Sequence, residues 1–310
     1  RMDDSSTTDN HEGELTRGNT PRASPGQYRY TLANLGIERA FEWGDLVSQT
    51  SYTTKDFELF LDGSRLVPGG ALPVLGLSDA NHSESVSQEL RLVSATGDSP
   101  WKWLAGAFYF QTQLYDCAEA GVLTGLPVLP IPIPGPLEGV SANYCPGNAA
   151  NLAGSLNIGQ LLADVEVEET ALFGELTREL GEQWEVTAGA RVYRTQSGGT
   201  VSTKGALYSA QNLLLPSVRE NVLQERGISP KASLVFHPSR DLRAYFTASR
   251  GFRFGGPQIG ASTPTTKVPE VYKSDSLWNY ELGLRTDWLD QSLRIDGSVY
   301  RIVWTNPQVR

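Results

Sequence analysis

The sequence has no excess of positive charge and no long apolar run. Its formal net charge is -9 over 310 residues. Proteins that bind nucleic acid need a basic surface, so a nucleic-acid partner is excluded. No stretch of about 18 apolar residues occurs, so no transmembrane helix is expected. The chain starts at Arg1 without the segments of a signal peptide, which indicates either a cytoplasmic protein or a missing start.

Motifs for metals, cofactors and catalysis are also missing. The chain has 2 cysteines and 3 histidines, in no spacing typical of a metal site. The glycine-rich stretch 249–260, SRGFRFGGPQIG, fits neither a dinucleotide fingerprint nor a P-loop. The turn 237–241, HPSRD, contains His, Ser and Asp, but adjacency in a tight turn is not the geometry of a catalytic triad. We therefore expect no metal, no cofactor and no enzymatic activity.

The two cysteines stand on either side of a proline-rich stretch. Cys117 and Cys145 flank LPVLPIPIPGP at 126–136. We predict a disulfide that closes this loop, which would place the protein in an oxidising compartment. Two unpaired buried thiols are the alternative.

Alternation of apolar and polar residues with period two is abundant. The segment 184–194 places Trp184, Val186, Ala188, Ala190 and Val192 on one face, opposite Glu185, Thr187, Gly189, Arg191 and Tyr193. The segment 277–287 repeats this arrangement, and similar faces occur in several other segments. Such alternation is typical of β-strands. Only Ser155 to Asp164 has the pattern of a short amphipathic helix, inside a long loop.

Short polar turns and long links alternate along the chain. The short turns lie at 42–45, 96–100, 180–183, 237–241 and 288–292, and the long links at about 55–85, 114–167, 196–228 and 254–275. Five hairpins follow, and hence an all-β, antiparallel fold of about ten up-and-down strands. All short turns would then lie at one end of the strands and all long links at the other.

This asymmetry favours a membrane β-barrel over a soluble sandwich, which would turn its apolar faces inward. Trp43, Trp101, Trp184 and Trp288 lie in or beside four of the five short turns, as in the aromatic girdle of a barrel. Charged residues are confined to one face of the clearest strands, as lipid contact on the other face requires. We therefore predict a transmembrane barrel segment whose apolar faces point to lipid.

Several blocks resemble the barrel of TonB-dependent outer-membrane receptors. They are SQELRLVSATGDSPWKWLAGAFYFQTQ, ETALFGELTREL, WEVTAGARVYRT, LRAYFTASRGFRFGG and SLWNYELGLRTDWLDQSLRIDGSVYRIVW, at 87–113, 169–180, 184–195, 242–256 and 276–304. The resemblance implies part of a 22-stranded barrel that is filled by a plug domain. Residues 1–310 are expected to be one barrel segment, with a loop at 1–27, five hairpins at 28–304, the start of a loop at 305–310, and no plug domain or TonB box. The alternative is a closed ten-stranded barrel, a size known for outer-membrane proteases.

The resemblance also implies a function. Members of the family take up scarce nutrients, most often ferric siderophores, across the outer membrane of Gram-negative bacteria. The implied partners are TonB, through the missing plug domain, a small-molecule ligand and outer-membrane lipid. A ten-stranded outer-membrane hydrolase and a soluble β-rich binding module are the alternatives. His237 lies at the short-turn end, which weakens the hydrolase.

Aromatic and polar residues in or near the long links are candidates for contact with an anionic iron chelate. They are Tyr193, Arg194, Tyr208, Arg250, Phe252, Arg253, Gln258 and Tyr272. Lining of the barrel lumen is the other interpretation of most of them. We expect the glycines of 249–260 to allow close backbone approach at the rim of the barrel rather than to bind phosphate.

Overall fold

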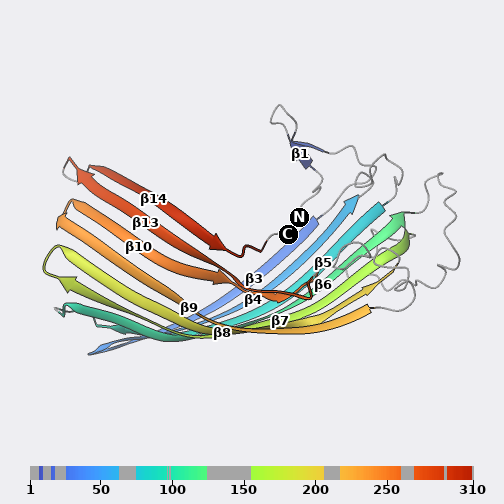
Figure 1. Ribbon diagram of the computed structural model, residues 1–310, viewed down its shortest axis with the longest axis horizontal. Helices are drawn as coiled ribbons and strands as arrows, with labels where there is room; N and C mark the ends of the chain where they lie inside the picture. Colours follow the sequence, from blue (N-terminus) through green and yellow to red (C-terminus); the bar gives the residue numbers. More distant parts are fainter. Residues whose placement is uncertain are drawn as a thin grey trace.

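The computed structural model describes residues 7–9, 15–17, 26–62, 75–95, 97, 99–123, 155–205, 217–259, 269–289 and 292–308. Ten of its strands form one antiparallel sheet (Figure 1). They are β3 (Gly26–Phe41), β4 (Gly44–Asp62), β5 (Leu75–Ser94), β6 (Trp101–Leu123), β7 (Ser155–Leu180), β8 (Trp184–Lys204), β9 (Ser217–Ser239), β10 (Leu242–Arg253), β13 (Asp275–Trp288) and β14 (Leu293–Thr305). Two small hairpins join β1 (Thr7–Asp9) with β2 (Leu15–Arg17), and β11 (Gly256–Pro257) with β12 (Val271–Tyr272).

The sheet follows chain order from β3 at one edge to β14 at the other. All five predicted short turns join neighbouring strands and lie together at one end of the curved sheet (Figure 1). The prediction of about ten up-and-down strands is therefore confirmed. The two edge strands do not pair with each other, so the alternative of a closed ten-stranded barrel is wrong.

Other predicted boundaries need correction. Ser155 to Asp164 is the first part of β7 and not a helix, because its residues alternate between the two faces of the sheet. Strands continue far into the predicted long links, so that only 63–74 separates β4 from β5. The predicted loop at 1–27 contains β1, β2 and the start of β3. Among the described residues, no helix is long and apolar enough to cross a membrane.

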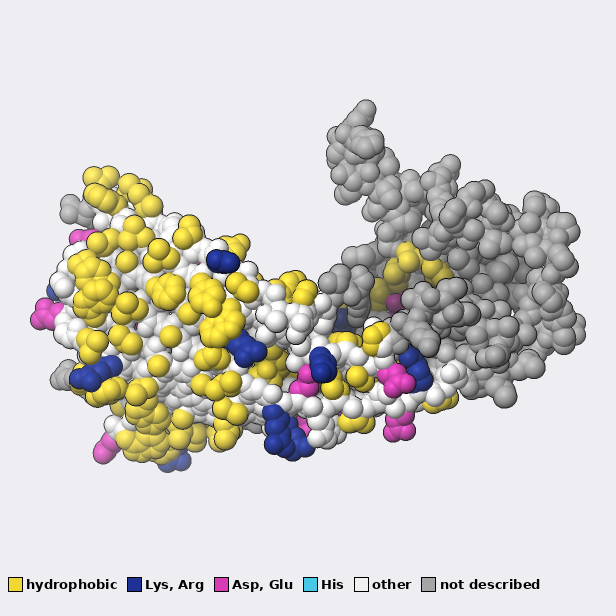
Figure 2. Space-filling model, viewed as in Figure 1, with side chains coloured by type: hydrophobic (Ala, Val, Ile, Leu, Met, Phe, Trp, Pro, Cys, Tyr) yellow, Lys and Arg dark blue, Asp and Glu magenta, His cyan; other side chains and the backbone are white. Residues whose placement is uncertain are grey.

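The apolar faces predicted from the sequence point outward, away from the concave side of the sheet. On β7, Leu172 is 68% exposed whereas its neighbour Ala171 is 6% exposed; on β8, Val192 is 57% exposed whereas Tyr193 is 9% exposed. Figure 2 shows apolar side chains gathered over the half of the visible face that lies next to the short turns. The soluble sandwich required these faces to be packed together, and the structure instead leaves them uncovered.

The outward apolar surface forms a belt of limited height. On β8 it runs from Trp184 to Val192, and the next outward residues are Arg194 and Gln196. Nine residues are close to the 9 to 11 that a tilted strand needs to cross a bilayer. We call this surface the apolar belt, the part of the sheet between it and the short turns the lower end, and the part beyond it the upper half.

In the upper half the pattern is reversed. A buried apolar cluster on the inner, concave face contains Leu161, Ala163 and Val165 of β7 and Val201 of β8. The outward residues of the same part of β7 are Asp164, Glu166 and Glu168. Strands of a membrane barrel carry apolar residues outward only where they contact lipid, so this reversal is the pattern expected where such strands leave a bilayer.

Candidate ligand-binding surface in the lumen

The site begins where β10 separates from its neighbour. Pairing of β10 with β9 ends at Ser249, opposite Lys231. Beyond this point the end of β10 and the β11–β12 hairpin lie over the inner face of β8 and β9. The glycine-rich stretch, which the sequence predicted to permit close backbone approach, therefore passes over the lumen wall.

Four aromatic rings meet on this inner face. Phe252 stacks on Tyr193 of β8 with ring centroids 3.7 Å apart and an interplanar angle of 5°. Phe254 contacts Phe252 edge-on at 5.6 Å and stacks on Phe110 of β6 at 6.1 Å. The two contacts of Phe254 fall within the range of about 4.5 to 7 Å that is favourable for offset-stacked and edge-on aromatic pairs. The four rings therefore form one aromatic cluster on the inner wall.

Gly227 on β9 leaves room for this stack, because glycine has no side chain. Gly227 is the register partner of Tyr193, and the tyrosine ring occupies the space that a Cβ atom at Gly227 would need. Tyr193 therefore reaches across β9 toward β10. Tyr245 of β10 covers Gly283 of β13 in the same way, nearer the short turns.

Polar groups surround the rings. Glu169, opposite Phe110 in the register, is buried and accepts a 3.0 Å hydrogen bond from Nε of Arg191. The Arg191 guanidinium also lies 4.4 Å from the ring centroid of Phe108. Arg250 donates to Oγ of Ser276 at 3.2 Å. The inner wall therefore offers cations, carboxylates and aromatic faces within one surface.

The β11–β12 hairpin is seated closely on the wall. A Cβ atom at Gly255 would lie 2.6 Å from the Tyr272 carbonyl oxygen, and one at Gly256 would lie 2.8 Å from Oγ of Ser197. The backbone amide of Ser274 donates to the Glu225 carboxylate at 3.1 Å. These contacts agree with the expectation that the glycines permit close approach.

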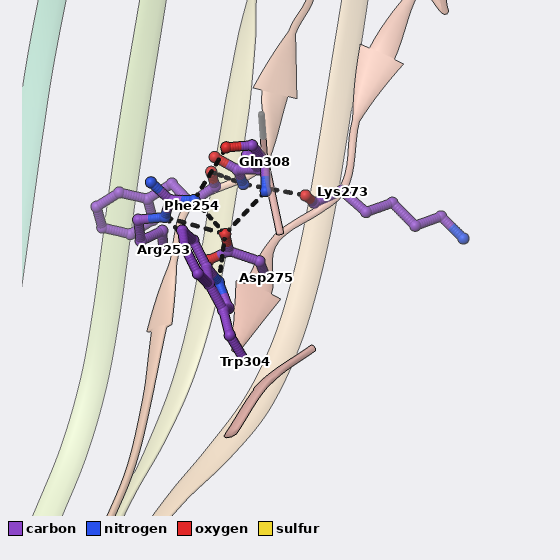
Figure 3. A network of polar contacts seen from close by, with 6 residues as sticks. All are labelled: Arg253, Phe254, Lys273, Asp275, Trp304 and Gln308. Atoms are coloured by element: carbon purple, nitrogen blue, oxygen red, sulfur yellow. Dashed lines mark hydrogen bonds and ion pairs between the residues drawn. The ribbon is translucent and has the colours of Figure 1, made fainter. Parts of the chain in front are cut away.

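A polar network fixes the root of the hairpin (Figure 3). Arg253 forms an ion pair with the buried carboxylate of Asp275, which also accepts from Nε1 of Trp304 at 3.0 Å and from the Gln308 amide at 3.1 Å. The Gln308 side chain donates to the carbonyl oxygens of Phe254 and Lys273, at 2.8 and 3.1 Å. The Arg253 hydrogen bond is the main cause that lowers the pKa of Asp275 to about 2. The network ties β10, β13 and β14 together beside the hairpin.

A second polar group lies in the upper half of the inner face, on β5 and β6. Asn81 donates to Asp79 at 2.8 Å and to Asp116 at 3.0 Å, so that two carboxyl groups lie side by side. Burial first, and then the charge of Asp116, raise the pKa of Asp79 to about 6. At neutral pH this pair is a local concentration of negative charge.

The structure brings some of the predicted site residues together and separates others. Tyr193 and Phe252 are in direct contact; Gln258 and Tyr272 belong to the hairpin, where the Gln258 amide donates to the Glu270 carbonyl at 2.9 Å. Arg253 is engaged with Asp275, and Arg194 lies on the outward face, where it donates to Gln224 at 3.2 Å. Tyr208 lies outside the described residues.

The predicted disulfide remains a prediction. Cys117 is 1% exposed. Cys145 lies outside the described residues.

Sequence reasoning missed Phe110, Phe254, Ser197 and Asp275. Phe254 stood in the quoted glycine-rich stretch, and Phe110 follows two aromatic residues in AFYF. Neither position showed a signal for a site, because contact between them depends on how the end of β10 crosses the sheet. Asp275 begins a strand, and nothing in the sequence indicated its partners.

Solved structures with the same architecture include three receptors. The ferric yersiniabactin uptake receptor FyuA from Yersinia pestis superposes with a TM-score of 0.68 and 14% identity, over 93% of this chain and 38% of that one. The closed form of the ferric-catecholate import receptor Fiu from E. coli K12 gives 0.62 and 12%, over 94% and 43%. The siderophore receptor PiuA from Acinetobacter baumannii gives 0.60 and 12%, over 89% and 40%. The chain therefore spans about two fifths of the length of these receptors.

These likenesses define a fold class, a curved wall of antiparallel up-and-down strands. The family described as TonB dependent receptor-like, beta-barrel, matches residues 3–310. The chain belongs to this family, which is one of receptors rather than enzymes. The family prediction made from the sequence is confirmed.

Proposed function

We propose that the chain forms part of the wall of an outer-membrane receptor that imports an iron–siderophore complex or a similar scarce nutrient with energy from TonB. The observation that carries this proposal is the reversal of the apolar pattern along β7 and β8. Below the reversal a curved wall carries apolar residues outward and polar residues inward, as a lipid-embedded pore requires. The three similar receptors are a ferric yersiniabactin uptake receptor, a ferric-catecholate import receptor and a siderophore receptor, and this supports the choice of cargo.

In this proposal the aromatic surface contacts the ligand. Phe252 and Phe254, which the buried Tyr193 ring supports from beneath, would contact the apolar parts of a chelate, and Arg250 would attract its negative charge. Gln258 and Tyr272 would contact it from the hairpin, which Arg253 holds in position through Asp275. Arg194 is left out of this surface because it lies on the outward face.

The test uses the full-length receptor that contains this chain. Cells that lack the receptor should grow poorly when iron is supplied only as the cognate chelate, and a ferric catecholate, ferric yersiniabactin and ferric citrate are the probes. Inactivation of TonB should abolish uptake but leave binding unchanged. Absence of the receptor from the outer-membrane fraction, or uptake that does not depend on TonB, would overturn the proposal.

The ligand surface has a matched control. Y193A should weaken binding of the cognate chelate about ten-fold, because it removes a central aromatic contact. Y245A removes a tyrosine that also covers a glycine on the next strand, but away from the aromatic cluster, and it should change binding less than two-fold. Equal losses in the two variants would show that the inner-wall tyrosines act only on folding.

A further inference from the structure

The outward face carries two arginines side by side at the upper border of the apolar belt. Arg194 of β8 and Arg226 of β9 are direct register partners. Both are exposed, and the residues next to them toward the short turns are Val192 and Ile228, which belong to the apolar belt. Their position is therefore at the depth where lipid headgroups meet water.

Like charges directly opposite each other on neighbouring strands destabilise a sheet. Among the described residues, neither arginine forms an ion pair; Arg194 donates only to the neutral side chain of Gln224, and Gln224 in turn donates to Gln196. The outward acids of the neighbouring strand are Asp164, Glu166 and Glu168, which lie farther from the apolar belt along β7. Glu168 is the diagonal neighbour of Arg194 in the register, but within the described part of the wall neither arginine is neutralised by a direct ion pair.

A second pair of facing arginines lies next to an acid. Arg243 of β10 and Arg285 of β13 are also register partners, but they lie on the inner face. There Nε of Arg285 lies 3.5 Å from a carboxylate oxygen of Asp296. The inner pair therefore has an ion-pair partner on β14, whereas the outer pair has no ion-pair partner among the residues that the structure describes.

We infer that Arg194 and Arg226 bind the phosphate groups of the surrounding membrane lipid. Two guanidinium groups at headgroup depth form bidentate hydrogen bonds with phosphate oxygens and gain from the negative surface of an anionic leaflet. The apolar belt directly below them accepts the acyl chains of the same lipid molecule. The inference rests on the proposed function, since it requires the belt to lie in the outer membrane, whose outer leaflet holds the phosphorylated glycolipid lipid A.

The experiment measures binding of diphosphorylated lipid A to the purified full-length receptor by native mass spectrometry. Each arginine is expected to contribute about 5-fold, so R194Q/R226Q should bind about 25-fold more weakly than the unchanged receptor. The matched control R243Q/R285Q removes the same charge from the inner face and should remain within two-fold. Dephosphorylated lipid A should bind the unchanged receptor and R194Q/R226Q equally.

Other outcomes overturn the inference. Unchanged binding of lipid A to R194Q/R226Q would do so, as would competition by millimolar inorganic phosphate, which would indicate a site for a free anion. R194K/R226K keeps the charge and should keep most of the affinity, so it serves if the glutamine variant fails to fold. Fractionation and chelate binding, measured on the same preparations, test the proposed function separately, because the lipid contact can fail in a receptor that is correctly located and binds its chelate.

Discussion

The two halves of β7 have the same backbone geometry and opposite surfaces. From Leu172 to Leu180 the leucines point outward, and Glu175 and Thr177 point inward, where they contact Lys231 and Thr187. Nearer the other end of β7, Leu161, Ala163 and Val165 point inward and the acids Asp164, Glu166 and Glu168 point outward. A strand has no preference of its own for either arrangement, so the solvent outside the wall decides which face is apolar.

The largest effect should come from a charge placed in the apolar belt. L172R puts a guanidinium against lipid and should cost about 2 to 4 kcal/mol of unfolding free energy. V222R changes a side chain with similar exposure, 58% against 68%, in the upper half, and should cost less than about 0.5 kcal/mol. Urea unfolding of the full-length receptor in liposomes, followed by heat-modified gel mobility, measures both. Equal costs would mean that the upper half also lies in lipid.

A smaller effect is expected from the inner apolar cluster. Leu161 is 7% exposed and packs with Val165 and Val201, so L161A should cost about 2 kcal/mol. L172A, on the outward belt, leaves no cavity inside the protein and should cost less than half of that. The same unfolding assay applies, and a larger loss from L172A would contradict the reversal of the two faces.

Substitution of a glycine beneath a tyrosine ring should have the next largest effect on stability. G227A forces the Tyr193 ring away from Phe252 and should cost about 1 to 2 kcal/mol. G297A, on β14, adds a methyl group where nothing lies within 4 Å, and it should be close to neutral. Thermal unfolding of both variants measures the difference. Equal melting temperatures would show that the Tyr193 ring can adopt another position without loss of stability.

The smallest effect should be the pH dependence of the Asp79 and Asp116 pair. The folded-state pKa of Asp79, about 6, lies above its ordinary value of 3.8, so the folded state binds a proton more tightly than the unfolded state does. Stability is therefore highest below about pH 4 and falls as pH rises toward 6. D79N should stabilise the receptor above pH 6, by about 0.5 to 1 kcal/mol because the site is partly open to solvent, and should have no effect near pH 4.

Unfolding curves at pH 4, 6 and 8 test this prediction. D56N, on the neighbouring strand, removes a carboxylate that faces His82 instead of another acid. It should not stabilise the receptor at pH 8. Stabilisation by D79N of the same size at all three pH values would refute the shared-proton explanation.

The sequence predicted the lower part of this wall better than the upper part. The segment from Trp184 to Arg194 shows its alternation directly, because lipid contact requires every outward residue to be apolar. Ser155 to Asp164 looked helical because its apolar residues belong to the other face and mix with small polar ones. The contact of Phe252 with Tyr193 was not predictable, since it depends on where β10 leaves β9 and on the space above Gly227.

β7 extends far beyond the apolar belt. About 17 of its 26 residues continue beyond Leu172, which at about 3.3 Å per residue and a tilt near 40° carries the wall on the order of 40 Å past the bilayer core. Hydrogen-bonded strands rather than loose connections form this extension. In the proposed receptor, a solute would therefore meet a stiff rim of paired strands before it reached the depth of the lipid.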